Sequence, residues 1–453
     1  MRRLAALLVL LPGAALAHAS ERMVILTLPT GWYILGAGVA VALTALVGLA
    51  GGRLPAFGSR VLFDRPALVP CGVTSWIGAA SFWALIAVGI RGTRDPLENL
   101  LPLTVWTVLW VGLTLACVIF GNLWRDVAPW SGPVRAIRRA TGWQGSIGLS
   151  RLGHAPAVLG YLAFAWFEIV SLAPADPFVL ARAAAVYYLI ILALAVAEGE
   201  DWLETGEFAT LYFAFVARIA PFWAEYAPGR VRVRAGLPGA QVLRMEPLGA
   251  TAIAFLTLVL ASVSFDGLHE TFWWLVQIGI NPLDYPGRSA VWMVNSLALP
   301  GFWLLSAATI LAAIRLGVPK GTRFSDMAGP MMLAILPIAA GYHVAHYLIA
   351  LLTNGQYVIA ALNDPFGRGW NLFGLPDHWV SFGFLATRGG TLGIWIAQFA
   401  IILAAHLLAV VLGLKIAQRF AGGDRFATHL PMTVLMIGYT VFGLWMLSSP
   451  TAG

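Results

Sequence analysis

Charged residues are scarce in this chain. Lys, Arg, Asp and Glu make up only 11% of its 453 residues, whereas 59% are hydrophobic. Soluble globular proteins carry about 25% charged residues, so this composition excludes that class. The repeated apolar runs of eighteen or more residues indicate an all-α, polytopic helical membrane protein.

Cysteine and several familiar catalytic motifs are also lacking. The two cysteines, Cys71 and Cys117, have no CxxC partner, so neither a disulfide nor a thiolate metal site is expected. The sequence has no Walker loop, no GxSxG elbow, no HExxH motif and no clear internal repeat. Nucleotide-driven transport and ordinary serine or zincin hydrolysis therefore have no sequence support.

The N-terminus has the pattern of a signal peptide. Arg2 and Arg3 precede a Leu, Ala and Val core that ends in the small-residue segment 15–17. We expect cleavage after Ala17, which would leave 18–453 as a single multi-spanning membrane domain. The alternative is an uncleaved first span.

Hydropathy after this segment predicts ten transmembrane helices. Their expected ranges are 30–50, 74–91, 101–120, 154–172, 178–197, 247–265, 289–314, 327–353, 391–414 and 430–448.

The distribution of basic residues predicts how these helices are oriented. The alternate loops 51–73, 121–153, 198–246, 315–326 and 415–429 carry 3, 5, 5, 3 and 3 basic residues, whereas all the intervening segments together carry at most six. The positive-inside rule places the five basic loops in the cytoplasm. We therefore expect a bacterial inner-membrane protein with both mature termini in the periplasm, in contact with the lipid bilayer and not with nucleic acid.

The segment 208–222 is apolar but short. A span there would move the cluster Arg230, Arg232 and Arg234 to the outer side. We therefore interpret the segment as interfacial.

Two histidines inside the span 327–353 are the most informative feature. His343 and His346 are three residues apart and share a helix face. Ionisable groups are costly to bury in a bilayer, so their presence there indicates a function. Pro337 interrupts the backbone ladder and predicts a kink just before the pair.

Other polar residues of the predicted spans fall at a similar depth. Helical rise places them within about 15 Å of the outer helix ends. They are Glu168, Arg182, Asn295, His343, His346 and Gln398, and Asp266, His269 and Glu270 cap the layer from the outer end of 247–265. This clustering favours a polar cavity open to the outside.

Imidazoles and carboxylates are good ligands for a divalent transition metal such as Zn or Cu. His343, His346 and Glu168 are the candidate ligands, with a fourth position open. Two alternatives remain. The histidines can donate to a carbonyl freed by Pro337, or to other polar side chains, as contacts between helices. Glu168 can form an ion pair with Arg182.

Two further residues have alternative interpretations. Arg368 lies in the outer loop 363–371, which either forms a lid over an anionic group or belongs to an aromatic interface belt. His406 lies deeper than the layer and is expected to be a hydrogen-bonded core residue.

At these residues the chain resembles the polytopic bacterial membrane proteins labelled fenitrothion hydrolase. The resemblance covers nearly the whole mature chain and is carried by FAWFE at 164–168, FDG at 265–267, AGYHVAHY at 340–347, NDPFGRGW at 363–370 and GLWMLS at 443–448. The resemblance implies hydrolysis of an apolar organophosphate triester. If the native substrate is a different compound, this hydrolysis is a side activity.

The leading hypothesis is a membrane-embedded, metal-dependent hydrolase. The ion would polarise the phosphoryl oxygen, Asp266 or Glu270 would act as general base, and Arg368 would oppose developing negative charge. A copper-type metal permease and a non-catalytic subunit that needs a partner chain are the alternatives. A permease needs polar steps down to the cytoplasm, and the sequence shows none below His406.

Overall fold

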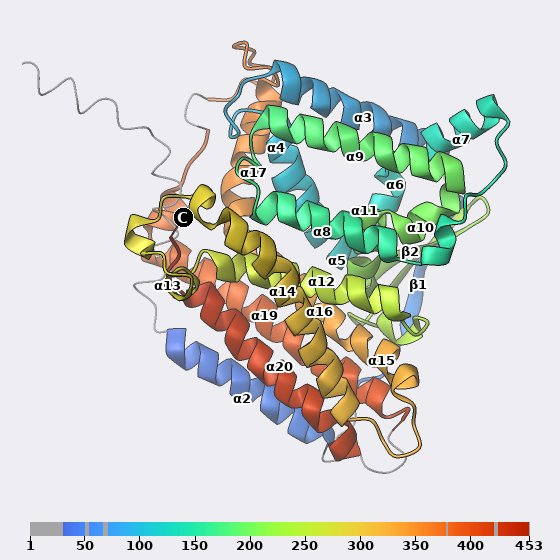
Figure 1. Ribbon diagram of the computed structural model, residues 1–453, viewed down its shortest axis with the longest axis vertical. Helices are drawn as coiled ribbons and strands as arrows, with labels where there is room; N and C mark the ends of the chain where they lie inside the picture. Colours follow the sequence, from blue (N-terminus) through green and yellow to red (C-terminus); the bar gives the residue numbers. More distant parts are fainter. Residues whose placement is uncertain (1–29, 50–53, 67–70, 377–378, 421–424, 453) are drawn as a thin grey trace, which may run out of the picture.

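A computed structural model describes residues 30–49, 54–66, 71–376, 379–420 and 425–452 (Figure 1). The predicted signal peptide 1–17 lies outside these ranges. The longer helices are α2 (Thr30–Leu49), α3 (Cys71–Arg91), α7 (Ser131–Thr141), α8 (Ala155–Ile169), α9 (Pro177–Glu198), α11 (Phe208–Val216), α12 (Ala250–His269), α14 (Arg288–Leu316), α15 (Phe324–Met332), α16 (Leu336–His346), α17 (Leu348–Asn363), α19 (Arg388–Ala417) and α20 (Arg425–Ser448).

Short helices connect these elements. They are α4 (Leu100–Pro102), α5 (Thr114–Phe120), α6 (Trp124–Val127), α10 (Leu203–Gly206), α13 (Phe272–Gln277) and α18 (Gly383–Ala386). Between α4 and α5 the chain is π-helical over Leu103–Leu113 (η2). A π-helix of this length is rare, and π-helical turns are frequent at functional sites.

The all-α prediction is confirmed. Within the described ranges, nine helices are long and apolar enough to cross a membrane, and they coincide with nine of the ten predicted spans. The tenth, 154–172, corresponds to α8, whose 15 residues extend only about 22 Å. The chain is thus a multi-pass helical protein in which α8 is shorter than a full span.

Two helical segments form the centre of the bundle. In the span 324–346, made by α15 and α16, 94% of the apolar stretch is buried, and in α12 the buried share is 78%. The corresponding share for α3, α9 and α14 is only 28%. The residues that the sequence analysis singled out on α12 and α16 therefore lie among protein helices, away from the surrounding lipid.

The predicted span 327–353 is interrupted twice. A 3₁₀ turn at Leu333–Ile335 comes just before Pro337, in agreement with the predicted kink. The helix then ends at His346, and α17 begins at Leu348. The prediction of a continuous helix to residue 353 was wrong, and the break places Tyr347 at a junction between two helices.

The segment 208–222 was predicted to be interfacial, and the structure corrects this in part. Its helix α11 and the following turn at Ala217–Ile219 are too short to cross a membrane. Side chains such as Leu211 and Tyr212 are nevertheless buried, and α11 packs against α5, α8 and α16. The helix therefore enters the bundle instead of lying along its surface, because its apolar side chains are covered on several sides.

One end of the bundle carries a small antiparallel sheet that the sequence analysis did not predict. Its strands are β1 (Ser59–Pro66), β2 (Phe222–Ala227) and β3 (Arg230–Gly236), in the order β1-β3-β2. The Arg-Val alternation of β3 has the period of two expected for a strand.

The predicted basic loops meet at this end. Strands β1 and β3 join the loops 51–73 and 198–246, and the guanidinium of Arg419 donates to the carbonyl oxygen of Leu243. In Figure 1 the strands lie at the right, whereas α13 and the C-terminal end of the chain lie at the left. At that other end, Ala452 N–H donates to the carbonyl oxygen of Glu270.

Candidate functional site

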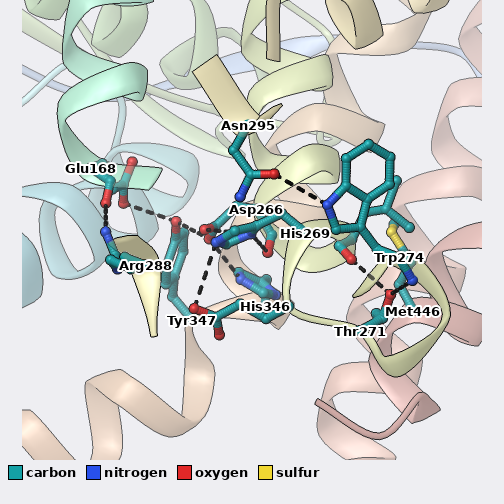
Figure 2. Close-up of polar contacts among 12 residues, drawn as sticks. Glu168, Asp266, His269, Thr271, Trp274, Arg288, Asn295, His346, Tyr347 and Met446 are labelled. Carbon is teal, nitrogen blue, oxygen red and sulfur yellow. Dashed lines mark hydrogen bonds and ion pairs between the residues drawn. The ribbon is translucent and has the colours of Figure 1, made fainter. Parts of the chain in front are cut away.

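Four side chains form a connected hydrogen-bond cluster where several helices end (Figure 2). His346 Nε2 lies 2.9 Å from Asp266 Oδ2. The Tyr347 hydroxyl oxygen lies 2.6 Å from the same Asp266 oxygen and 2.9 Å from Glu168 Oε1. We call Glu168, Asp266, His346 and Tyr347 the polar cluster.

Helix ends position these residues. Glu168 is next to the last residue of α8, Asp266 lies in the last turn of α12, and His346 is the last residue of α16. Tyr347 lies at the junction before α17. Three helices that are distant in sequence therefore deliver the cluster to one level of the bundle.

The number of available protons limits which hydrogen bonds the polar cluster can form at the same time. A phenol has a single proton, so Tyr347 donates to one carboxylate at a time. Its contacts with Asp266 and Glu168 are both hydrogen bonds only when one carboxyl is protonated and donates to the phenol oxygen. The cluster is then a continuous chain of proton donors and acceptors from Glu168 to His346.

The cluster is buried unevenly. The side chain of Asp266 is 14% exposed, and that of His346 is 25% exposed. A carboxylate in such a position is held by its hydrogen bonds, because an unpaired charge is costly to bury. His346 is therefore the member of the Asp266–His346 pair that is more accessible to a reactant.

Arg288 brings a positive charge to the backbone of Glu168. It opens α14, and its Nη1 donates to the carbonyl oxygens of Glu168, at 2.7 Å, and Ser171, at 3.2 Å. These bonds satisfy carbonyls at the end of α8, which lack partners within the helix. Arg182, the predicted ion-pair partner of Glu168, instead lies over the ring of Phe178.

His269 and Glu270 continue the cluster along the end of α12. His269 Nδ1 lies 2.8 Å from the carbonyl oxygen of Asp266. Its Nε2 is buried, has no hydrogen-bond partner among the described residues and lies 3.6 Å from Glu270 Oε1. Of the predicted general bases, Asp266 thus belongs to the polar cluster, and Glu270 lies at its border.

The imidazole of His343 has its hydrogen-bond partner outside the polar cluster. Its Nε2 donates to the carbonyl oxygen of Trp110, at 2.8 Å, in the π-helical segment η2. The imidazole packs edge-on against the indole of Trp110 and lies near the ring of Tyr212. The two histidines of the pair therefore have different partners, although both rings contact Tyr347.

This arrangement bears on the predicted metal site at His343, His346 and Glu168. Among the described residues, no group of three or more His, Cys, Asp or Glu side chains converges in a way that would hold a metal ion. His343 is engaged with Trp110 and Glu168 with Tyr347. A Zn or Cu ion held by these three side chains stays a prediction, and the present donor set does not fit one.

Arg368 is not brought to the polar cluster. Its guanidinium lies over the ring of Phe366, and its backbone N–H donates to Asp364 Oδ1. The neighbouring Gly367 lies against Thr93, in the connection between α3 and α4. The described contacts of Arg368 are thus those of a surface loop.

Other predicted polar residues act as contacts between helices. Gln398 Nε2 donates to the carbonyl oxygen of Ala345, and Asn295 Oδ1 accepts from Trp274 Nε1. His406 is buried, with its Nδ1 2.9 Å from the carbonyl oxygen of Ile402 in its own helix. This agrees with the expectation that His406 is a core residue.

Tyr347, Arg288 and Trp110 are the site residues that sequence reasoning missed. Tyr347 directly follows His346, but an aromatic residue in an apolar run is usually interpreted as a core residue. Arg288 precedes a predicted span in a segment with few basic residues, which was an available signal. Trp110 contributes a backbone carbonyl, for which side-chain chemistry offers no signal.

Comparisons with protein-family models, with curated proteins and with solved structures found no match. Functional inference for this chain therefore rests on the polar cluster itself.

Proposed function

We propose that this chain is a membrane-embedded hydrolase that acts on apolar, phosphotriester-like substrates from the periplasmic side. The observation that carries the proposal is the Asp266–His346 pair, joined at 2.9 Å and backed by Tyr347 and Glu168. An imidazole oriented by a carboxylate is a common general base in hydrolysis.

The roles of the pair follow from its geometry. Asp266 accepts the Nε2 proton of neutral His346, which leaves Nδ1 as the basic nitrogen. His346 then takes a proton from water as the water oxygen bonds to phosphorus. The bond from phosphorus to the leaving oxygen breaks, and the imidazolium returns the proton to that oxygen. The general base of this cycle is His346, in place of the Asp266 or Glu270 expected from the sequence.

Tyr347 and Glu168 support this cycle. When His346 becomes positively charged, the Asp266 carboxylate stabilises the imidazolium through the existing hydrogen bond. A proton shared between Glu168 and Tyr347 keeps the two carboxyl groups from being charged together beside one hydroxyl. Arg288, bonded to the Glu168 carbonyl, adds positive charge on the same side.

The charge of the cluster favours a neutral substrate. With a proton held between Glu168 and Tyr347, the Asp266 carboxylate remains charged, so it would repel an anionic phosphate diester. A neutral triester avoids that repulsion and partitions into the apolar surroundings of the helices. The proposed chemistry uses protein groups alone, and a metal held by His343, His346 and Glu168 stays the separate prediction given above.

The test uses the full chain in lipid nanodiscs with a p-nitrophenyl dialkyl phosphate as substrate. We expect His346→Gln to lower kcat by about 10²–10⁴-fold, the usual contribution of a general base. His406→Gln is the matched control, because it removes a buried imidazole outside the polar cluster. Equal rates for the wild-type protein and His346→Gln would overturn the proposal, as would a wild-type rate no greater than that of empty nanodiscs.

One observation favours a metal permease as a second candidate. The side chain of His429 is fully buried beside Gly413 of α19. Within the part of the chain that the structure describes, His429 and His406 each have a buried Nε2 without a hydrogen-bond partner. They provide polar positions below the cluster that a conduction path requires. Loss of Cu or Zn flux into proteoliposomes in His406→Gln, with hydrolysis absent from the wild-type protein, would support this candidate.

A further inference from the structure

The three-stranded sheet at the basic end of the bundle concentrates positive charge. Its strands contain five arginines but only two carboxylates, Asp64 and Glu225. Asp64 pairs with both Arg230 and Arg232. One of the two carboxylates on the sheet is thus already paired with two arginines near one end of β3.

Two guanidinium groups converge near the other end of β3 on one neutral oxygen. Arg234 Nε and Nη2 lie 3.3 and 3.1 Å from Ser59 Oγ, and Arg244 Nη2 lies 3.2 Å from it. Glu225 Oε2 reaches only Arg234 Nη1, at 3.4 Å. A hydroxyl cannot neutralise two cations, so this position retains a net positive charge.

A hollow lies at the same place. It has a volume of about 360 Å³ and is lined by Gly58, Ser59, Arg60, Ala235 and Gly236. This volume falls in the range of roughly 300–1,000 Å³ that is typical of small-ligand sites. The forked donors of arginine match the oxygens of a phosphate group.

The sheet lies where helices leave the bundle. Strand β1 lies between α2 and α3 in the chain, and the buried Trp223 of β2 packs against Gly121 at the end of α5. The side chains of Val61, Phe63 and Phe222 are nevertheless 41–47% exposed. Exposed apolar side chains beside arginines are typical of a surface that contacts anionic lipid.

We propose that this sheet binds the headgroup phosphate of an anionic phospholipid, in the leaflet next to the basic end of the bundle. Arg234 and Arg244 contact the phosphate at the Ser59 hollow, and the exposed apolar side chains rest in the interfacial region. The positive-inside rule accounts for the number of arginines in these loops. It does not account for the convergence of two guanidinium groups on one hydroxyl beside a hollow.

The test measures lipid binding to the purified full chain by native mass spectrometry, with phosphatidylglycerol, phosphatidylcholine and inorganic phosphate as separate probes. We expect phosphatidylglycerol to bind most tightly. The double variant Arg234→Gln/Arg244→Gln should weaken it by about fivefold for each arginine removed. The control Arg139→Gln/Arg323→Gln changes the net charge equally at two exposed positions outside the sheet. Arg244→Gln alone, an exposed substitution, serves if the double variant fails to fold.

Two outcomes would overturn the proposal. One is equal loss of phosphatidylglycerol binding in the sheet variant and its charge-matched control, which would indicate a nonspecific charge effect. The other is full displacement of the lipid by inorganic phosphate, which would identify free phosphate as the ligand.

Discussion

His343 and Trp110 are 233 residues apart in sequence but are joined by a hydrogen bond of 2.8 Å from the imidazole Nε2 to the backbone carbonyl oxygen. The Thr114 hydroxyl donates to the same oxygen at 2.7 Å. This carbonyl belongs to the π-helical segment Leu103–Leu113 and has side-chain partners on both α5 and α16. His343 therefore ties α16 to the distorted helix beside it.

The two histidines should consequently respond differently to substitution. His343→Ala leaves the buried Trp110 carbonyl with one donor fewer, so we expect a loss of roughly 1–3 kcal/mol in the free energy of unfolding. His346→Ala should abolish hydrolysis with a smaller effect on thermal stability, because His346 is partly exposed. Thermal unfolding, kcat and metal content are measured on the same samples. Loss of a bound metal in both variants would instead support the predicted shared site.

Tyr347→Phe tests the link between the two carboxyl groups. The substitution removes one oxygen and leaves the ring contacts in place. We expect kcat to fall by about tenfold or more, since the loss of one hydrogen bond to a charged group is worth about 1.5–3 kcal/mol. The matched control is Tyr357→Phe on α17, whose ring packs on Phe382 away from the cluster. An unchanged pH profile of kcat in Tyr347→Phe would argue against the proton chain.

Helix positions were the part of this fold that could be predicted from sequence. Apolar runs report transfer into lipid directly, so nine predicted ranges match long helices within the described residues. The sheet was missed because the arginines of β3 are typical of a positive-inside loop. Their alternation with valine, which indicates a strand, was given less weight than their charge. A break such as that at Tyr347 depends on packing between helices, which hydropathy does not report.

Sequence could predict several residues of the candidate site, but not the contacts between them. Helical depth correctly suggested that Glu168, Asp266 and His346 lie at a similar level, and the structure brings them together. Helical spacing also suggested that His343 would join them, but facing a common side does not determine the partner. The Trp110 carbonyl competes for His343 because a distorted helix offers an acceptor there.

Close packing of α16 on α19 should make Gly341 intolerant of a side chain. A Cβ on Gly341 would lie 2.4 Å from Ala405 Cβ, so one helix would have to shift. We expect Gly341→Ala to destabilise the protein by about 1–3 kcal/mol and to weaken the bond from Gln398 to Ala345. Gly393→Ala on α19 is the control, because no atom of the described residues lies within 4 Å of its Cβ position. Equal unfolding temperatures for the two variants would contradict this packing.

The sheet should loosen in acid because of Asp64. Hydrogen bonds from Arg230 and Arg232 lower the pKa of Asp64 from its usual value of 3.8. The stabilisation is therefore fully present above about pH 4 and is lost as the pH falls through the lowered pKa. Amide exchange over 59–66, corrected for intrinsic rates, should increase in that window. Asp64→Asn should exchange faster than the wild-type protein at neutral pH and lose this acid dependence, whereas parallel profiles would exclude Asp64 as the cause.

The orientation in the membrane gives the last prediction. The basic loops meet around the sheet, so the positive-inside rule predicts that this whole end faces the cytoplasm. Ser325, exposed in the basic loop 315–326, and Ser381, exposed between α17 and α19, fall on opposite sides in this topology. In intact cells, a membrane-impermeant maleimide should label Ser381→Cys, whereas Ser325→Cys should react only after lysis. The reverse pattern would place the polar cluster on the cytoplasmic side and would rule out access to it from the periplasm.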